Sequence, residues 1–98
     1  VALGDALYDL ARGELWRGGE PIRLTSGEAG LMRALARAPN APISRERLVA
    51  ELGGGAGLAS ERAVDVQITR LRRKIEADPR RPRYLQTVRG EGYMLTPD

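Results

Sequence analysis

The sequence predicts an α+β fold in which an N-terminal antiparallel sheet is followed by three helices and a C-terminal β-hairpin. Apolar and polar residues alternate over short segments of residues 1 to 24, which is typical of strands, whereas residues 25 to 77 carry helical caps and helical spacing. Residues 84 to 96 then repeat the strand pattern around a glycine-containing turn. The 98 residues suffice for one modest core, so we expect a single domain over residues 1–98.

The N-terminal sheet is expected to contain three or four short strands. Gly18-Gly19 separates two of them and suits a two-residue hairpin turn, because both central residues of such a turn favour positive φ. We expect Trp16 to pack in the core of this sheet rather than to serve as a stacking platform.

Capping residues mark the beginning of the first two helices. Thr25 and Glu28 form a capping box, and the helix they start is expected to stop near Ala38, because the segment Pro39-Asn40-Ala41-Pro42 cannot continue it. Ser44 is the next N-cap and predicts a helix from Arg45 to Leu52. A glycine-rich connector from Gly53 to Ala59 follows.

The third helix, from about Ser60 to Ala77, is the one best defined by its periodicity. One stripe is aliphatic and predicts a core face made of Val64, Ile68, Leu71 and Ile75. The opposite side is mostly polar and basic and carries Arg62, Val66, Thr69, Arg70 and Arg73. The helix therefore has one face for its own core and one for a partner.

The C-terminal residues predict a hairpin with an arginine near its tip. The expected strands are Tyr84–Val88 and Tyr93–Thr96, joined by the turn Arg89-Gly90-Glu91-Gly92. Helix, turn, helix and then a hairpin is the order of elements in a winged helix-turn-helix fold.

Charge distribution favours a polyanionic partner and disfavours catalysis. Nine basic residues stand against five acidic ones between Glu61 and Gly92, whereas the whole chain carries a net charge of only +3. The chain has no Cys and no His, which excludes Cys-His and Ser-His catalysis and the usual zinc sites. We therefore expect no enzyme, no metal and no cofactor. Absence of Cys and of a long apolar run fits a cytoplasmic protein without a membrane partner.

A helix with this division of faces fits the major groove of double-stranded DNA. Base edges and phosphates require polar and basic side chains on the side away from the protein core. An arginine at the tip of a thin hairpin, such as Arg89, can enter the narrower minor groove, where negative potential attracts a guanidinium group. Sequence-specific binding of duplex DNA is therefore the leading functional hypothesis.

Several blocks resemble the effector domain of OmpR/PhoB-type bacterial response regulators, and the resemblance covers essentially the whole chain. The two most specific blocks are Arg62-Ala63-Val64-Asp65-Val66-Gln67-Ile68-Thr69-Arg70-Leu71-Arg72 and Thr87-Val88-Arg89-Gly90-Glu91-Gly92-Tyr93. Two positions depart from the family pattern, with Ala29 where an aromatic residue is usual and Gly53 where Trp is usual.

The resemblance implies a role for matched residues and a set of partners. Arg62, Val66, Thr69 and Arg70 would face the major groove, with Arg73 on the same side, while Arg72, Thr87 and Tyr93 would serve the phosphate backbone and Arg89 the minor groove. It also implies head-to-tail homodimers on direct-repeat half-sites, a contact to RNA polymerase through Gly53–Ala59, and a phosphorylatable receiver domain that is not present in these 98 residues.

Other interpretations stay open at the level of sequence. The arginines of the third helix could form an ordinary solvated face with pairs such as Arg73 and Glu76, and the basic surface could dock an acidic protein or RNA. A small carboxylate enzyme would need two facing acids, and no spacing suggests them. Asp65 is expected to orient a neighbouring arginine or the preceding loop, because a carboxylate facing phosphate would be repelled.

Overall fold

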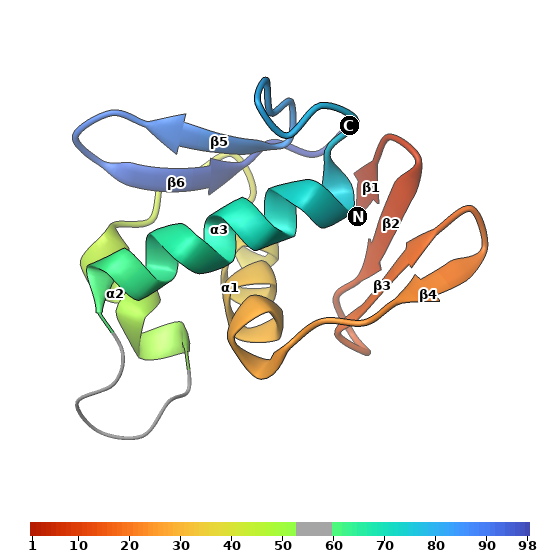
Figure 1. Ribbon diagram of the computed structural model, residues 1–98, viewed down its shortest axis with the longest axis horizontal. Helices are drawn as coiled ribbons and strands as arrows, with labels where there is room; N and C mark the ends of the chain where they lie inside the picture. Colours follow the sequence, from red (N-terminus) through yellow and green to blue (C-terminus); the bar gives the residue numbers. More distant parts are fainter. Residues whose placement is uncertain (53–59) are drawn as a thin grey trace.

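The computed structural model describes residues 1–52 and 60–98, which form six strands and three helices. It confirms the predicted α+β winged helix-turn-helix fold, with a four-stranded sheet beside the helices and a two-stranded wing (Figure 1). In chain order the elements are β1 (Ala2–Leu3), β2 (Ala6–Asp9), β3 (Glu14–Arg17), β4 (Glu20–Ile22), α1 (Ser26–Arg37), α2 (Arg45–Glu51), α3 (Glu61–Ile75), β5 (Leu85–Val88) and β6 (Gly92–Leu95).

The N-terminal sheet is antiparallel throughout, in the order β1-β2-β3-β4. The two-residue turn at Gly18 and Gly19 is confirmed, since both have positive φ, of 58° and 83°. The expectation for Trp16 was wrong: it is only half-buried and pairs with Leu7, which is 53% exposed. Alternation along β3 places its neighbour Leu15 in the core instead, so Trp16 lies on the outer face of the sheet.

The capping box at the start of α1 is confirmed. The backbone N–H of Glu28 donates to Thr25 Oγ1 over 3.2 Å, and the backbone N–H of Thr25 donates to Glu28 Oε1 over 2.8 Å. Glu28 is buried, and Lys74 Nζ on α3 lies 2.6 Å from its Oε1. Burial by itself would raise the pKa of Glu28, but hydrogen bonds from Lys74 and from the Thr25 backbone outweigh burial and lower it. The cap thus also joins α1 to α3.

Helix α2 begins after Ser44, as predicted, with Ser44 Oγ accepting from the backbone N–H of Arg47. It ends at Glu51, one residue before the expected end, because Leu52 serves as its C-cap. A Cβ on Gly30 of α1 would lie 1.9 Å from the carbonyl oxygen of Glu51. Close contact between the two helix backbones therefore requires glycine at that position.

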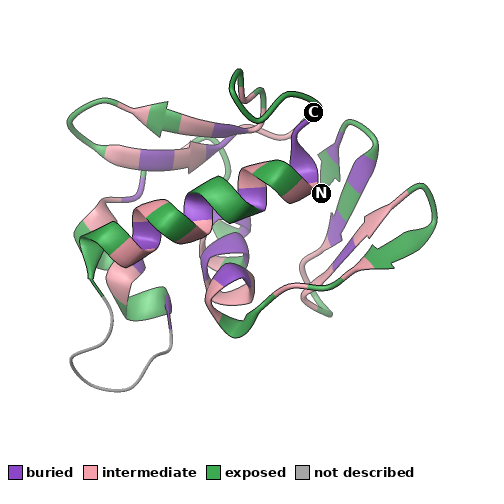
Figure 2. Ribbon diagram, in the orientation of Figure 1, coloured by how far each residue is buried: buried purple, intermediate pink, exposed green. Residues whose placement is uncertain are grey.

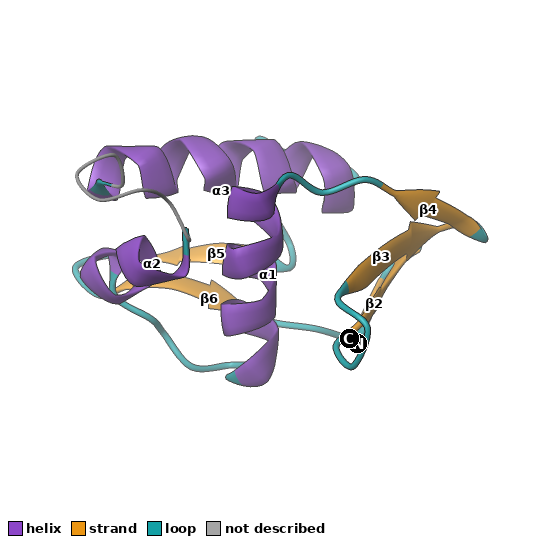
Figure 3. Cartoon of the chain, turned by 90° about the horizontal axis from the view of Figure 1, so that it is seen from below, coloured by secondary structure: helices purple, strands orange, loops and turns teal. Residues whose placement is uncertain are grey.

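Helix α3 lies across α1 and carries the predicted core stripe (Figure 3). Its four aliphatic side chains are at most 2% exposed, namely Val64, Ile68, Leu71 and Ile75. The helix ends at Ile75 rather than near Ala77, because the backbone of Glu76 turns to an extended conformation. The Glu76 carboxylate is buried and accepts hydrogen bonds from three successive backbone N–H groups at the base of the wing, those of Arg83, Tyr84 and Leu85.

The wing is confirmed as a hairpin, although β5 starts at Leu85 instead of Tyr84, and β6 runs from Gly92 to Leu95 instead of from Tyr93 to Thr96. Strand β5 begins one residue late because the backbone N–H of Tyr84 donates to the Glu76 carboxylate. Ile43 adds a bridge to the outer side of β6, exchanging two backbone hydrogen bonds of 2.8 and 3.0 Å with Tyr93. A Cβ on Gly92 would lie 2.0 Å from the Ile43 carbonyl oxygen, so glycine is required there too.

The two ends of the described chain lie side by side (Figures 1 and 3). The backbone N–H of Asp98 donates to the carbonyl of Ala2 over 2.9 Å. The Asp98 carboxylate accepts from the backbone N–H of Gly4 over 2.7 Å and from the Tyr84 hydroxyl over 3.0 Å. The last residues thus connect the base of the wing to the N-terminal sheet.

Replacing Glu76 with Gln should lower the free energy of unfolding by about 2 to 3 kcal/mol, because an amide offers one acceptor oxygen to three backbone N–H donors, of which that of Leu85 is buried. Glu20→Gln, at an exposed position of β4, is the matched control and should change it by less than about 0.5 kcal/mol. Urea unfolding of both variants measures the difference. Equal effects would show that Glu76 does not anchor the wing.

Candidate nucleic-acid interface

The face of α3 opposite the core is exposed along its length (Figure 2). Because the helix turns by about 100° per residue, burial of the aliphatic stripe leaves the predicted binding side facing solvent. This side contains the five residues expected there, all of them exposed, namely Arg62, Val66, Thr69, Arg70 and Arg73. The pair between Arg73 and Glu76 considered from the sequence does not form, since Glu76 is buried under the wing.

Three kinds of contact chemistry alternate on this face. Arg62, Arg70 and Arg73 offer planar guanidinium groups, which suit phosphate oxygens and guanine edges. Val66 is 44% exposed, and an aliphatic side chain in that place can contact a thymine methyl group. The Thr69 hydroxyl donates to the carbonyl of Asp65 over 3.1 Å, so it remains free to accept.

Arg89 lies in the exposed turn between β5 and β6, which is at the upper left of Figure 1, above α2 and the start of α3 in that view. The turn is closed by a hydrogen bond of 2.9 Å from the Glu91 N–H to the carbonyl of Val88, and Gly90 in it has a φ of 78°. Its backbone is therefore ordered by local bonds, while the arginine extends from it. An exposed cation on a narrow support is the geometry that a groove contact requires.

Arg72 is directed at the wing rather than into solvent. Its Nε donates to the carbonyl of Leu85 over 2.9 Å, and its Nη2 donates to Thr87 Oγ1 over 2.8 Å. The guanidinium also lies over the Tyr93 ring, 5.7 Å from its centre. Burial lowers the pKa of Arg72, against the opposing influence of Tyr93 and Glu76, but an arginine remains charged.

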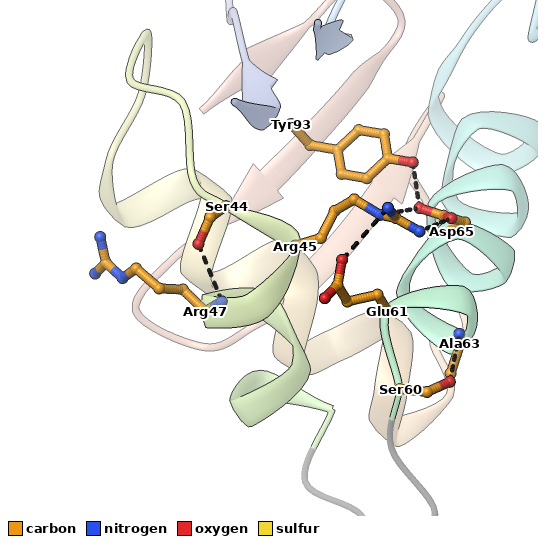
Figure 4. A network of polar contacts seen from close by, with 8 residues as sticks. All are labelled: Ser44, Arg45, Arg47, Ser60, Glu61, Ala63, Asp65 and Tyr93. Carbon is orange, nitrogen blue, oxygen red and sulfur yellow. Dashed lines mark hydrogen bonds and ion pairs between the residues drawn. The ribbon is translucent and has the colours of Figure 1, made fainter. Parts of the chain in front are cut away.

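Asp65 is the centre of a polar network that joins three elements (Figure 4). Arg45 at the start of α2 donates to both of its carboxylate oxygens, and the Tyr93 hydroxyl of β6 donates to Oδ1 over 2.6 Å. Glu61 Oε1 lies 3.3 Å from the third guanidinium nitrogen of Arg45, Nη1. The hydrogen bond to Asp65 raises the pKa of Arg45. The expectation that Asp65 orients a neighbouring arginine is confirmed.

A hollow of about 600 Å³ lies between the start of α2, the first turns of α3 and the wing. Two of the acids that line it, Glu61 and Asp65, are paired with Arg45.

Within residues 1–52 and 60–98, no group of three or more His, Cys, Asp or Glu side chains is arranged to hold a metal ion. No helix in that same part of the chain is long and apolar enough to cross a membrane.

The structure thus separates the candidate site residues into two groups. In the described part of the chain, the five residues on the outward face of α3 and Arg89 in the wing turn make no hydrogen bond between α3 and the wing, whereas the side chains of Arg72, Thr87 and Tyr93 do. Sequence reasoning missed the contacts of Arg45, which lies 20 residues before Asp65. The one signal was the expectation that Asp65 orients a neighbouring arginine or the preceding loop, which did not identify Arg45.

Comparison with known proteins gives a consistent result. The family model described as "Transcriptional regulatory protein, C terminal" matches residues 19–95. Protein PetR of Rhodobacter capsulatus is 58% identical over 100% of this chain and 44% of its own length. The DNA-binding response regulator MtrA of Mycolicibacterium smegmatis is 39% identical over 99% of this chain and 42% of its own length. The chain therefore spans less than half the length of these curated relatives.

Two solved structures share the fold. The response regulator DrrB, a Thermotoga maritima OmpR/PhoB homologue, superposes with a TM-score of 0.82 and 34% identity over 98% of this chain and 43% of its own. The Klebsiella pneumoniae RstA DNA-binding domain, solved in complex with the RstA box, gives a TM-score of 0.78 and 28% identity over 100% of this chain and 97% of its own.

Titration of Tyr93 should make the free energy of unfolding fall at alkaline pH. Burial, followed by the hydrogen bond to Asp65, raises the pKa of Tyr93 from 10.0 to about 12. The folded state holds the phenolic proton more tightly, so this stabilisation is complete below pH 10 and is lost as the pH rises towards 12. Urea unfolding across this range should show the decline. Tyr93→Phe should show less of it, and an identical decline in that variant would assign the pH dependence to other groups.

Proposed function

Because the chain belongs to the family of transcriptional regulatory protein C-terminal domains, we propose that it binds a specific double-stranded DNA sequence in the control of transcription. The observation that carries this proposal is the exposed face of α3, where three arginines stand opposite a fully buried aliphatic stripe. Exposed arginines of this kind contribute little to the stability of the fold itself. They offer positive charge and hydrogen-bond donors to a polyanion instead.

We propose that α3 enters the major groove. Arg62, Val66, Thr69 and Arg70 would meet base edges, and Arg73, one turn further on, would meet bases or the adjacent phosphates. Arg89 would enter the minor groove from the wing. Support comes from RstA of Klebsiella pneumoniae, whose DNA-binding domain has the same fold and was solved with its DNA box.

The phosphate contacts expected of Arg72, Thr87 and Tyr93 stay a prediction. Each of these side chains lies near the proposed DNA surface, yet each has a hydrogen-bond partner within the protein. Thr87 is exposed and retains a lone pair for a further donor, while the Tyr93 hydroxyl already donates its one hydrogen bond to Asp65. The internal bonds therefore compete with a direct role.

We further propose that the chain is the effector domain of a longer cytoplasmic response regulator with a receiver domain. Its relatives named as response regulators are more than twice as long as the matched region. In this setting two copies would bind direct-repeat half-sites head to tail. A contact with RNA polymerase through residues 53–59 was also expected, and those residues lie outside the described part of the chain.

A binding role, rather than catalysis, is the proposal for the hollow beside the wing. Paired carboxylates could in principle transfer protons, but Asp65 and Glu61 both lie within ion-pair distance of Arg45. Both carboxylates therefore already have a structural partner within the protein.

Selection of bound duplexes from a random DNA pool tests the proposed function directly. A preferred sequence should emerge and bind about 10³-fold more tightly than random duplex at physiological salt. Two competitors test the alternative interpretations. An RNA duplex of the same sequence tests RNA binding, and an acidic protein tests docking to a protein partner. Equal affinity for random and selected duplex would contradict the proposal.

Arg70→Ala should weaken binding to the selected site by about 1 to 3 kcal/mol and relax base preference at one position, if Arg70 reads a base edge. Arg37→Ala, an exposed arginine at the end of α1, is the matched control and should leave both quantities unchanged. Titrations on the selected site and on its single-base variants measure the difference. A uniform loss on every sequence would assign Arg70 to the phosphate backbone instead.

A further inference from the structure

Two side chains of α3 hold the two members of one cross-strand pair in the wing. Thr87 of β5 lies opposite Tyr93 of β6 in the hairpin register. Arg72 Nη2 donates to Thr87 Oγ1 over 2.8 Å, and Asp65 accepts from the Tyr93 hydroxyl over 2.6 Å. Asp65 and Arg72 are seven residues apart, or about two helical turns, so they stand on the same side of the helix.

The anionic half of this arrangement is itself held in place. Arg45 donates to both oxygens of the Asp65 carboxylate, which fixes the plane of that carboxylate, and Arg45 belongs to α2 (Figure 4). The cationic half is held as well, because Arg72 Nε also donates to the carbonyl of Leu85. The Asp65 carboxylate therefore cannot change its orientation without breaking its hydrogen bonds to Arg45, and the Arg72 guanidinium cannot do so without breaking its bond to Leu85.

The position of this pair in the hairpin gives it leverage over the tip. Thr87 and Tyr93 lie one pair away from the last one, Val88 with Gly92, after which the turn with Arg89 begins. The other anchors act nearer the base of the wing or on the β6 backbone, as Glu76 does at Leu85 and Ile43 at Tyr93. Side-chain bonds to the pair, together with the Ile43 backbone bonds to Tyr93, therefore orient the wing turn relative to α3.

We propose that Asp65 and Arg72 form a clamp on Thr87 and Tyr93 that positions Arg89 relative to α3. The clamp rests on the proposed DNA-binding function and makes these four residues positioning residues. By fixing the distance between α3 and the wing turn, it sets how far apart a major-groove and a minor-groove contact can lie on one duplex. Groove width next to the major-groove site thereby becomes part of what the protein recognises.

Direct phosphate contact is the competing role for the same side chains, and the two roles differ in their dependence on Arg89. A side chain that binds a phosphate of its own contributes the same factor whether or not Arg89 is present, since contacts that share no partner are additive. A clamp that acts by placing Arg89 contributes only while Arg89 is there. A double-mutant cycle with Arg89→Ala separates them.

The experiment measures affinity for the selected duplex at one salt concentration in the wild type, Tyr93→Phe, Thr87→Val, Arg89→Ala and the two double variants. Tyr93→Phe and Thr87→Val should each weaken binding by about 3- to 10-fold alone, and by less than about 2-fold when combined with Arg89→Ala. Thr87 is exposed, so Thr87→Val carries the test if Tyr93→Phe fails to fold.

Tyr84→Phe is the matched control, because it also removes a hydroxyl bonded to an aspartate, Asp98, but at the base of the wing. It should change affinity by less than about 2-fold in each background, relative to the wild type when Arg89 is present and relative to Arg89→Ala when it is not. Equal losses in both backgrounds for Tyr93→Phe and Thr87→Val, or no loss on removing Arg89, would overturn the clamp while duplex preference persists. Loss of duplex preference in the wild type itself would instead overturn the proposed function.

Discussion

Burial of one aliphatic stripe determines the orientation of α3 about its own axis. Val64, Ile68 and Leu71 are fully buried and Ile75 nearly so, and exposing any of them would cost about 2 kcal/mol or more. The helix therefore cannot rotate, and its outward arginines are fixed in direction by residues that never contact a partner. Because α3 carries both the buried stripe and the outward arginines, packing of the core sets the direction of the proposed DNA-binding face.

The wing is attached by different physics. Its inner residues Leu85 and Leu95 are buried, but the direction of the hairpin is determined by hydrogen bonds from charged side chains. Hydrophobic contacts tolerate sliding, whereas a carboxylate that accepts three N–H groups, as Glu76 does, permits one geometry. Apolar burial gives the wing its attachment, and polar bonds give it its orientation.

Local signals explain why most elements could be predicted from the sequence. The capping box of Thr25 and Glu28 and the period of the third helix involve residues three or four positions apart, so both are visible in the sequence. Trp16 shows the limit of this approach. Alternation shows that Trp16 and Leu15 face opposite sides of the sheet, but both sides carry apolar residues, and packing against the helices decides which side is buried.

The contacts that determine the candidate site are long-range, which is why sequence patterns missed them. Arg45 and Asp65 are 20 residues apart and Asp65 and Tyr93 are 28 apart, with no periodicity to link them. Likewise, the early end of α3 follows from a carboxylate that reaches residues seven to nine positions further on. Such contacts depend on how finished elements pack, so they become visible only once the fold is known.

Acids near the proposed DNA surface would weaken attraction to phosphate, and the fold limits this effect by pairing two of them, Glu61 and Asp65, internally, whereas Glu46 and Glu91 are exposed and form none of the described ion pairs. Asp65 and Glu61 both lie against Arg45, and Glu28 is buried against Lys74. The outward face of α3 and the wing turn carry four arginines, Arg62, Arg70, Arg73 and Arg89. None of these four forms an ion pair with another described residue. Arg45 and Lys74 thus neutralise Glu61, Asp65 and Glu28 and support the structure, which leaves a second set of cations free for a polyanion. The modest net charge of +3 conceals this division, because it counts both sets together.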